Sequence, residues 1–171
     1  MKTHGKSAYA RSLIQIMIFT AAIATTTLVL HEFGHFLAGN AAGCKNIEIM
    51  LLDKNFNTYT QMNCASGSDQ VLALSGFLLV VPFALALYLM NGHEKYYSLV
   101  TIGFNLIISS SDIALISQTL MNIGLITGMI TILYGENLLV SGHIGSLEKL
   151  SEIPYIISNE KDALLKSSRK P

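Results

Sequence analysis

Apolar residues fall into four long runs along the chain, with short polar stretches between them. The runs cover residues 13 to about 39, 70–90, 96 to about 120 and roughly 121–140. At 1.5 Å per helical residue, about 20 apolar residues cross a hydrocarbon core that is about 30 Å thick. The pattern therefore predicts about four transmembrane helices packed as one bundle. The first is longer than the core is thick, so it must tilt or protrude.

Residues 40–69 are polar and irregular, and two short segments within them are typical of strands. Residues 46–52 and 57–62 are expected to pair as a β-hairpin, with Asp53 and Asn55 among the turn residues between them. Cys44 and Cys64 flank this hairpin. They can pair as a disulfide if the hairpin faces an oxidising compartment, and they stay free thiols if it faces the cytosol.

Polar residues also interrupt the later runs. The third run contains Asn105, three serines at 109–111 and then Asp112, and Pro82 is expected to kink the helix of the second run. Residues 143–171 form a polar tail, for which we expect short amphipathic helices on either side of Pro154. The predicted organisation is a membrane-embedded core at 1–142, with the hairpin inserted at 44–64, followed by a tail at 143–171.

The composition supports an integral membrane protein. Hydrophobic residues make up 51% of the chain and charged residues 13%, and the mean hydropathy is +0.48. The net charge of zero gives no sign of a nucleic-acid-binding surface. A secretory signal explains the start less well, because the first run is too long and three more follow. The predicted fold class is an all-α polytopic membrane protein with a short β-hairpin after its first helix.

The distribution of basic residues predicts the orientation. With four crossings, both termini lie on the same side of the membrane, and nine Lys and Arg residues fall there, against two on the hairpin side. Because cytoplasmic segments carry an excess of Lys and Arg, this split predicts a multi-pass protein of the cell membrane with both termini in the cytoplasm.

The motif His31-Glu32-Phe33-Gly34-His35 lies near the end of the first run. On a helix, two histidines four residues apart share one face, so both imidazoles can bind one metal ion. Glu32 lies beside them, where a carboxylate can accept a proton from water at the metal. Ionisable groups inside an apolar segment are costly and usually functional, so the motif predicts a zinc site with Glu32 as its catalytic base.

Such a site needs a third protein ligand, and the acids within the apolar runs are Asp112 and Glu136. The first and third runs cross the membrane in the same direction, so Asp112 lies within one to two helical turns of the depth of the histidines. The fourth run crosses in the other direction, which puts Glu136 nearer the opposite face. Asp112 is therefore the better candidate, although it can also be read as the cap of a broken helix.

Asn105 lies two helical turns before Asp112 and can face the same cavity. It is a candidate to bind a substrate carbonyl or an oxyanion, and equally a candidate for a hydrogen bond between helices. Thr27 lies one turn before His31, where its hydroxyl can support the metal ligands or bond the carbonyl four residues back. The other histidines, His4, His93 and His143, are expected to be solvated.

In these motifs the chain resembles the site-2 protease family of intramembrane zinc metalloproteases. The likeness covers about residues 13–115: the His31–Ala38 segment, then Leu74-Ser75-Gly76-Phe77, then Asn105 to Asp112. It implies zinc held by two histidines and Asp112. The family usually has prolines before this Asp and a glycine after it, whereas this chain has serines and Ile113, and it has no PDZ-like domain. The family also places its zinc nearer the cytosol, which disagrees with the charge distribution.

The leading hypothesis is therefore an intramembrane zinc endopeptidase. Its expected partners are the lipid bilayer and a membrane-embedded or membrane-proximal peptide substrate, with the oligomeric state left open. The hairpin is expected either to bind an extended substrate by strand addition or to be purely structural. One alternative is another membrane zincin with Glu136 as third ligand. A second is a non-catalytic metal-binding or partner-binding bundle, which would have no need of Glu32.

Overall fold

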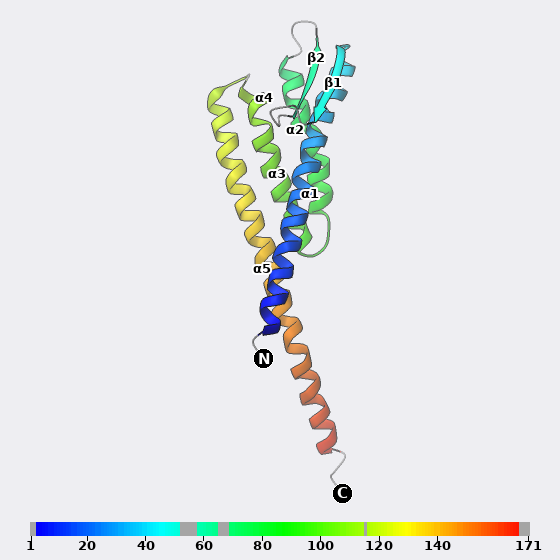
Figure 1. Cartoon of the computed structure of the whole chain (residues 1–171), viewed down its shortest axis with the longest axis vertical. Helices are drawn as coiled ribbons and strands as arrows, with labels where there is room; N and C mark the ends of the chain where they lie inside the picture. The colour runs from blue at the N-terminus through cyan, green and yellow to red at the C-terminus, as the bar shows by residue number, and fades with distance from the viewer. Residues whose placement is uncertain (1–2, 52–57, 65–68, 115, 168–171) are drawn as a thin grey trace.

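The computed structural model describes residues 3–51, 58–64, 69–114 and 116–167. In chain order the elements are α1 (Thr3–Ala41), β1 (Lys45–Leu51), β2 (Thr58–Asn63), α2 (Asp69–Tyr88), the 3-10 turn η1 (His93–Tyr96), α3 (Tyr97–Ile108), α4 (Ser110–Ala114) and α5 (Gln118–Ser167). Helix α1 leads from the end of the bundle where the chain starts to the end that carries the hairpin (Figure 1). Helix α2 returns, α3 and α4 lead back toward the hairpin, and α5 returns again.

Three helices within the described residues are long and apolar enough to cross a membrane. These are the segments Tyr9–Ala41, Val71–Tyr88 and Gln118–His143. Large apolar side chains on them stay exposed, such as Phe19 at 58% and Leu78 at 62%, which suits a surface that faces lipid. The membrane-protein class is supported, but the predicted number of four spans is wrong.

The third apolar run does not form the single long helix that was predicted. It forms a helix of 12 residues and a helix of five, separated at Ser109. The hydroxyls of Ser110 and Ser111 bond the carbonyls of Ile107 and Ile108, three residues back, at 2.6 and 3.0 Å. Such local bonds compete with helical ones and favour the end of a helix.

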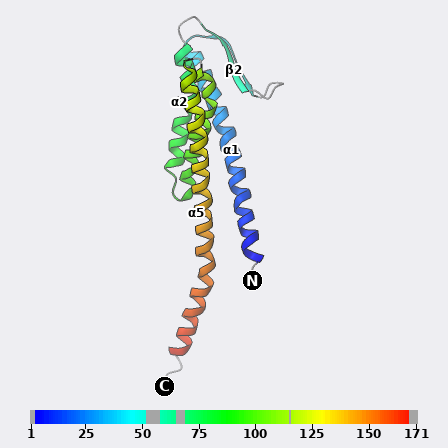
Figure 2. The same cartoon turned by 90° about the vertical axis from the view of Figure 1, so that its left-hand side faces the viewer.

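Helix α5 also differs from the prediction. The expected helices on either side of Pro154 are instead one helix that continues to Ser167. Its C-terminal part extends away from the rest of the bundle (Figures 1 and 2). A proline removes one helical hydrogen bond, which helix-forming residues on both sides can tolerate. Helix α2 likewise continues through Pro82 without a break.

Glycines allow the helices to approach one another closely. A Cβ atom on Gly34 of α1 would lie 2.5 Å from the carbonyl oxygen of Ser75 in α2. A Cβ atom on Gly103 of α3 would lie 2.7 Å from the carbonyl oxygen of Gly128 in α5. Small residues at such crossings are the usual means of helix packing in membranes, where apolar burial contributes little.

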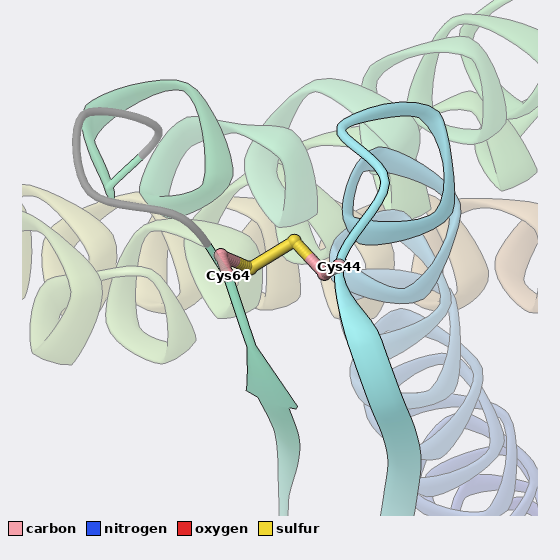
Figure 3. The surroundings of a disulfide bond; sticks show 2 residues. All are labelled: Cys44 and Cys64. Atoms are coloured by element: carbon pink, nitrogen blue, oxygen red, sulfur yellow. A yellow bond between two sulfur atoms is a disulfide. The ribbon is translucent and has the colours of Figure 1, made fainter.

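The hairpin matches its prediction within one residue at each described strand end. Strands β1 and β2 pair antiparallel, with Ile49 opposite Thr60 and a bulge between Lys45 and Glu48. The predicted turn at residues 53–56 lies outside the described residues. Cys44 and Cys64 form a disulfide where the two strands meet the helices (Figure 3), so the pairing that was one of two alternatives is present.

Candidate metal centre

His31 and His35 of α1 meet Asp112 of α4 at the hairpin end of the bundle. His31 Nε2 lies 2.8 Å from Asp112 Oδ2, and His35 Nε2 lies 3.2 Å from the same oxygen. The two Nε2 atoms are 3.1 Å apart. Three potential metal-ligand atoms, from helices far apart in sequence, therefore converge on one point.

This spacing fits a zinc ion. Ligand atoms at about 2.0–2.1 Å from a tetrahedral zinc lie about 3.3 Å from one another. The three observed separations, from 2.8 to 3.2 Å, are only slightly shorter than this value. Three such ligand atoms would leave the fourth position of a tetrahedral metal ion open.

The far nitrogen of His31 is held from α3. His31 Nδ1 lies 3.4 Å from Asn105 Oδ1 and 3.4 Å from Ser109 Oγ, and Asn105 donates its amide N–H to the carbonyl of Phe77 at 3.0 Å. With its amide nitrogen bonded to that carbonyl, Asn105 presents its oxygen to the ring. An acceptor at Nδ1 keeps the proton there and leaves the Nε2 lone pair for a metal.

The far nitrogen of His35 is held from α2. His35 Nδ1 donates to the carbonyl of Leu72 at 2.8 Å, and Ser75 donates its hydroxyl to the same carbonyl at 2.6 Å. This arrangement selects the same tautomer as in His31. Both histidines therefore turn Nε2 toward the centre, and each ring is oriented by a different helix.

Gly76 brings α2 directly against the two rings. A Cβ atom at this position would lie 2.6 Å from His31 Cε1 and 2.7 Å from each Nε2 atom. Even a methyl group would therefore collide with the ligand atoms. The sequence showed Gly76 only as part of a small-residue segment, because its contact with the histidines depends on how α1 and α2 cross.

Glu32 lines the same cavity as the three ligand atoms. Its side chain is buried at 4% exposure, and Thr60 of β2 donates its hydroxyl to Glu32 Oε2 at 2.8 Å. The cavity has a volume of about 370 Å³. It is lined by His31, Glu32, His35, Thr58, Tyr59, Thr60, Met62, Leu72, Ala73, Ile108, Ser111 and Asp112. Glu32, the three candidate metal ligands and one strand of the hairpin thus line a single cavity.

The structure separates the two candidate acids. Asp112 is at the histidines, whereas Glu136 lines a different cavity between α1 and α5, together with Leu13 and Thr20. The choice of Asp112 by depth therefore agrees with the geometry. No contact brings Glu136 to His31 or His35 within the part of the chain that the structure describes.

The side chains of Asn105 and Thr27 are both buried in the bundle. Asn105 is 2% exposed and forms the predicted bond between helices, while its role toward a substrate stays a prediction. Thr27 is fully buried, and its hydroxyl forms neither of its two expected bonds to any described residue. His93 and His143 are half-buried rather than solvated, and nothing is described of the His4 side chain.

No protein-family model, curated protein or solved structure matches this chain. Its functional interpretation therefore depends on the residues and geometry of the site itself.

Proposed function

We propose that the chain is an intramembrane zinc endopeptidase of the site-2 protease type. The observation that carries this proposal is the cavity that holds His31, His35, Asp112 and Glu32 together at one end of a bundle of apolar helices. A site that only stored a metal would need the three ligands. It would not need a buried carboxylate beside them.

The residues supply a complete set of roles for hydrolysis of a peptide bond. Bound zinc would supply Lewis acidity toward water and the scissile carbonyl. Glu32 accepts a proton from the attacking water on a carboxylate oxygen and gives it to the leaving amine nitrogen as the C–N bond breaks. Asn105 and the Leu72 carbonyl keep the two histidine rings in the required tautomer and orientation.

The hairpin offers a way to present the substrate. A transmembrane helix must unwind before it is cut, because its backbone groups are already bonded to one another. Strand β2 lines the cavity with Thr58, Tyr59, Thr60 and Met62. An extended peptide can add to such a strand through backbone hydrogen bonds, which would set the scissile bond beside Glu32.

We also propose that this end of the bundle faces away from the cytosol. Both chain ends lie at the opposite end (Figure 1), where nine of the eleven Lys and Arg residues also fall by sequence position. The Cys44–Cys64 disulfide suits an oxidising compartment. The resemblance to site-2 proteases implies the reverse orientation, so the two arguments make opposite predictions.

Substitution of the base tests the proposed activity. The purified protein is expected to bind about one zinc ion per chain and to cleave fluorescein-labelled casein, an unstructured probe, in detergent micelles. Glu32→Gln should keep the zinc, because Glu32 is not a ligand, and should lose cleavage by about 100-fold or more, as expected when a general base is removed.

The other outcomes discriminate between the alternatives. A Glu32→Gln protein that cleaves casein as fast as the wild type would end the peptidase proposal. A wild-type protein that binds stoichiometric zinc and leaves casein intact would favour the non-catalytic metal-binding bundle. Zinc that survives the double substitution of His31 and His35 by alanine would place the metal elsewhere.

A further inference from the structure

Thr60 of β2 contacts the proposed base through its hydroxyl group. Its hydroxyl oxygen lies 2.8 Å from Glu32 Oε2 and 3.1 Å from the Glu32 backbone carbonyl oxygen. The bond to Oε2 is the only hydrogen bond to the Glu32 side chain from within the described segments. Because one hydroxyl carries one proton, the short bond to the carboxylate is the stronger of the two.

A glutamate needs such a contact if it is to act as a base. Its side chain has three rotatable bonds, and fixing them in a buried site costs conformational entropy. A hydroxyl bonded to Oε2 fixes the carboxylate and leaves Oε1 for a proton of the attacking water. Proton transfer is efficient only when the base lies within hydrogen-bond reach of that proton.

The position of Thr60 is itself fixed by the rest of the hairpin. Thr58, Thr60 and Met62 are the half-buried residues of β2 and alternate with exposed ones. Beyond Thr60, Met62 packs on α1, since a Cβ atom on Gly39 would lie 2.8 Å from the Met62 sulfur. Beyond Met62, Cys64 is bonded to Cys44, just after α1 ends (Figure 3).

These three contacts follow one another in the same order along β2 and along α1. Residues 60, 62 and 64 of the hairpin meet residues 32, 39 and 44, so β2 runs alongside the last turns of α1 in the same direction. A shift of β2 by one residue would turn Thr60 to the other face of the strand and away from Glu32. The Met62 contact and the disulfide oppose such a shift.

We propose that Thr60 is a positioning residue for Glu32, and that the disulfide-closed hairpin serves to hold it there. The proposal rests on the proposed peptidase function, and it gives the hairpin a role in the chemistry besides any contact with substrate. It predicts that the hydroxyl matters, and not merely the volume of the side chain.

Three substitutions separate these possibilities. Thr60→Val keeps the shape and removes the hydroxyl, and Thr60→Ser keeps the hydroxyl. Thr131→Val in α5 is the matched control, because it removes a hydroxyl that bonds the carbonyl of Thr127 and does not line the cavity. With fluorescein-labelled casein we expect Thr60→Val to lower kcat by about 10–100-fold, with KM and bound zinc unchanged. Thr60→Ser should stay within about three-fold and Thr131→Val within about two-fold of the wild type. Equal rates for Thr60→Val and Thr131→Val would overturn the proposal, as would a serine variant no better than valine.

A second measurement does not depend on cleavage. The infrared carboxylate band of Glu32, identified as the band lost in Glu32→Gln, should shift in Thr60→Val and stay in place in Thr60→Ser. A band that is the same in wild type and Thr60→Val would disprove the contact. If the band shifts although the wild-type protein cleaves nothing, the contact holds and the proposed peptidase function fails.

Discussion

Each histidine of the site is oriented through the nitrogen that points away from the centre. His31 uses the side chain of Asn105 and His35 uses the backbone carbonyl of Leu72. A backbone carbonyl can be moved only by shifting α2, whereas the Asn105 amide can be altered by one substitution. The two supports come from different helices, so the mutual packing of α1, α2 and α3 determines where the Nε2 atoms meet.

At the scale of single residues, Gly76 is the glycine that packs against both histidine rings. We expect Gly76→Ala to abolish stoichiometric zinc binding, because its methyl group would lie 2.7 Å from both Nε2 atoms. The overpacking should also destabilise the fold by about 1–3 kcal/mol. Metal analysis of the purified variant and its thermal unfolding measure the two effects.

Gly124→Ala in α5 is the matched control for this prediction. A Cβ atom there meets only the carbonyl oxygen of Leu106, at an ordinary 3.7 Å. This variant should bind zinc like the wild type. Full zinc occupancy in Gly76→Ala would show that α2 lies farther from the histidines than the structure places it.

At the scale of elements, the third apolar run, which is broken into α3 and α4, determines the depth at which Asp112 lies. Tyr97 to Ala114 make 18 positions, which at 1.5 Å each rise about 27 Å, so α3 and α4 together still lift Asp112 to the level of the histidines. The depth argument from sequence assumed one straight helix. It pointed to the acid that lies beside the histidines, because the break at Ser109 shortens the rise only a little. The break itself follows from serine hydroxyls that bond local carbonyls.

We therefore expect Asp112→Ala and Glu136→Ala to differ sharply in zinc affinity. Loss of Asp112 removes a ligand atom and should weaken binding by more than the about 10–100-fold that outer-shell partners contribute. Glu136→Ala should leave affinity unchanged, since Glu136 lines another cavity. Competition with a chromophoric chelator gives both values. A larger loss in Glu136→Ala would favour a zincin with a different third ligand.

Local sequence rules predicted the hairpin and the histidine pair, because both follow from short periodicities. The alternation in β2 and the four-residue spacing of His31 and His35 need no tertiary information. The contact of Thr60 with Glu32 and that of Gly76 with the rings join segments 28 and more positions apart. Those contacts depend on crossing angles and strand register, which single-sequence patterns do not specify.

At the scale of the whole molecule, the predicted number of four spans is wrong. Both chain ends nevertheless lie at the same end of the bundle, as expected for four crossings (Figure 1). The η1 turn lies level with the end of the α5 span, because a Cβ atom on Gly142 would collide with the His93 ring. Lys95, in the same turn, therefore lies at the end of the bundle opposite the hairpin. The nine-to-two split of basic residues stays a prediction from sequence position, and the short α3 does not alter it.

The orientation that follows from this split is open to a direct test in intact cells. We expect Cys44 and Cys64 to react with a membrane-impermeant maleimide only after treatment with an impermeant phosphine reductant, because they form a disulfide that the proposed orientation puts outside the cytosol. The control is Asn91→Cys in a background with both native cysteines changed to serine. Asn91 is exposed at the opposite end, so this cysteine should react only once the cells are opened.

Labelling of the native cysteines without reduction would support export and refute the disulfide. If they react only in opened cells while Asn91→Cys reacts in intact ones, the hairpin and the metal site face the cytosol. The orientation of site-2 proteases would then hold, and the positive-inside argument would be wrong for this chain.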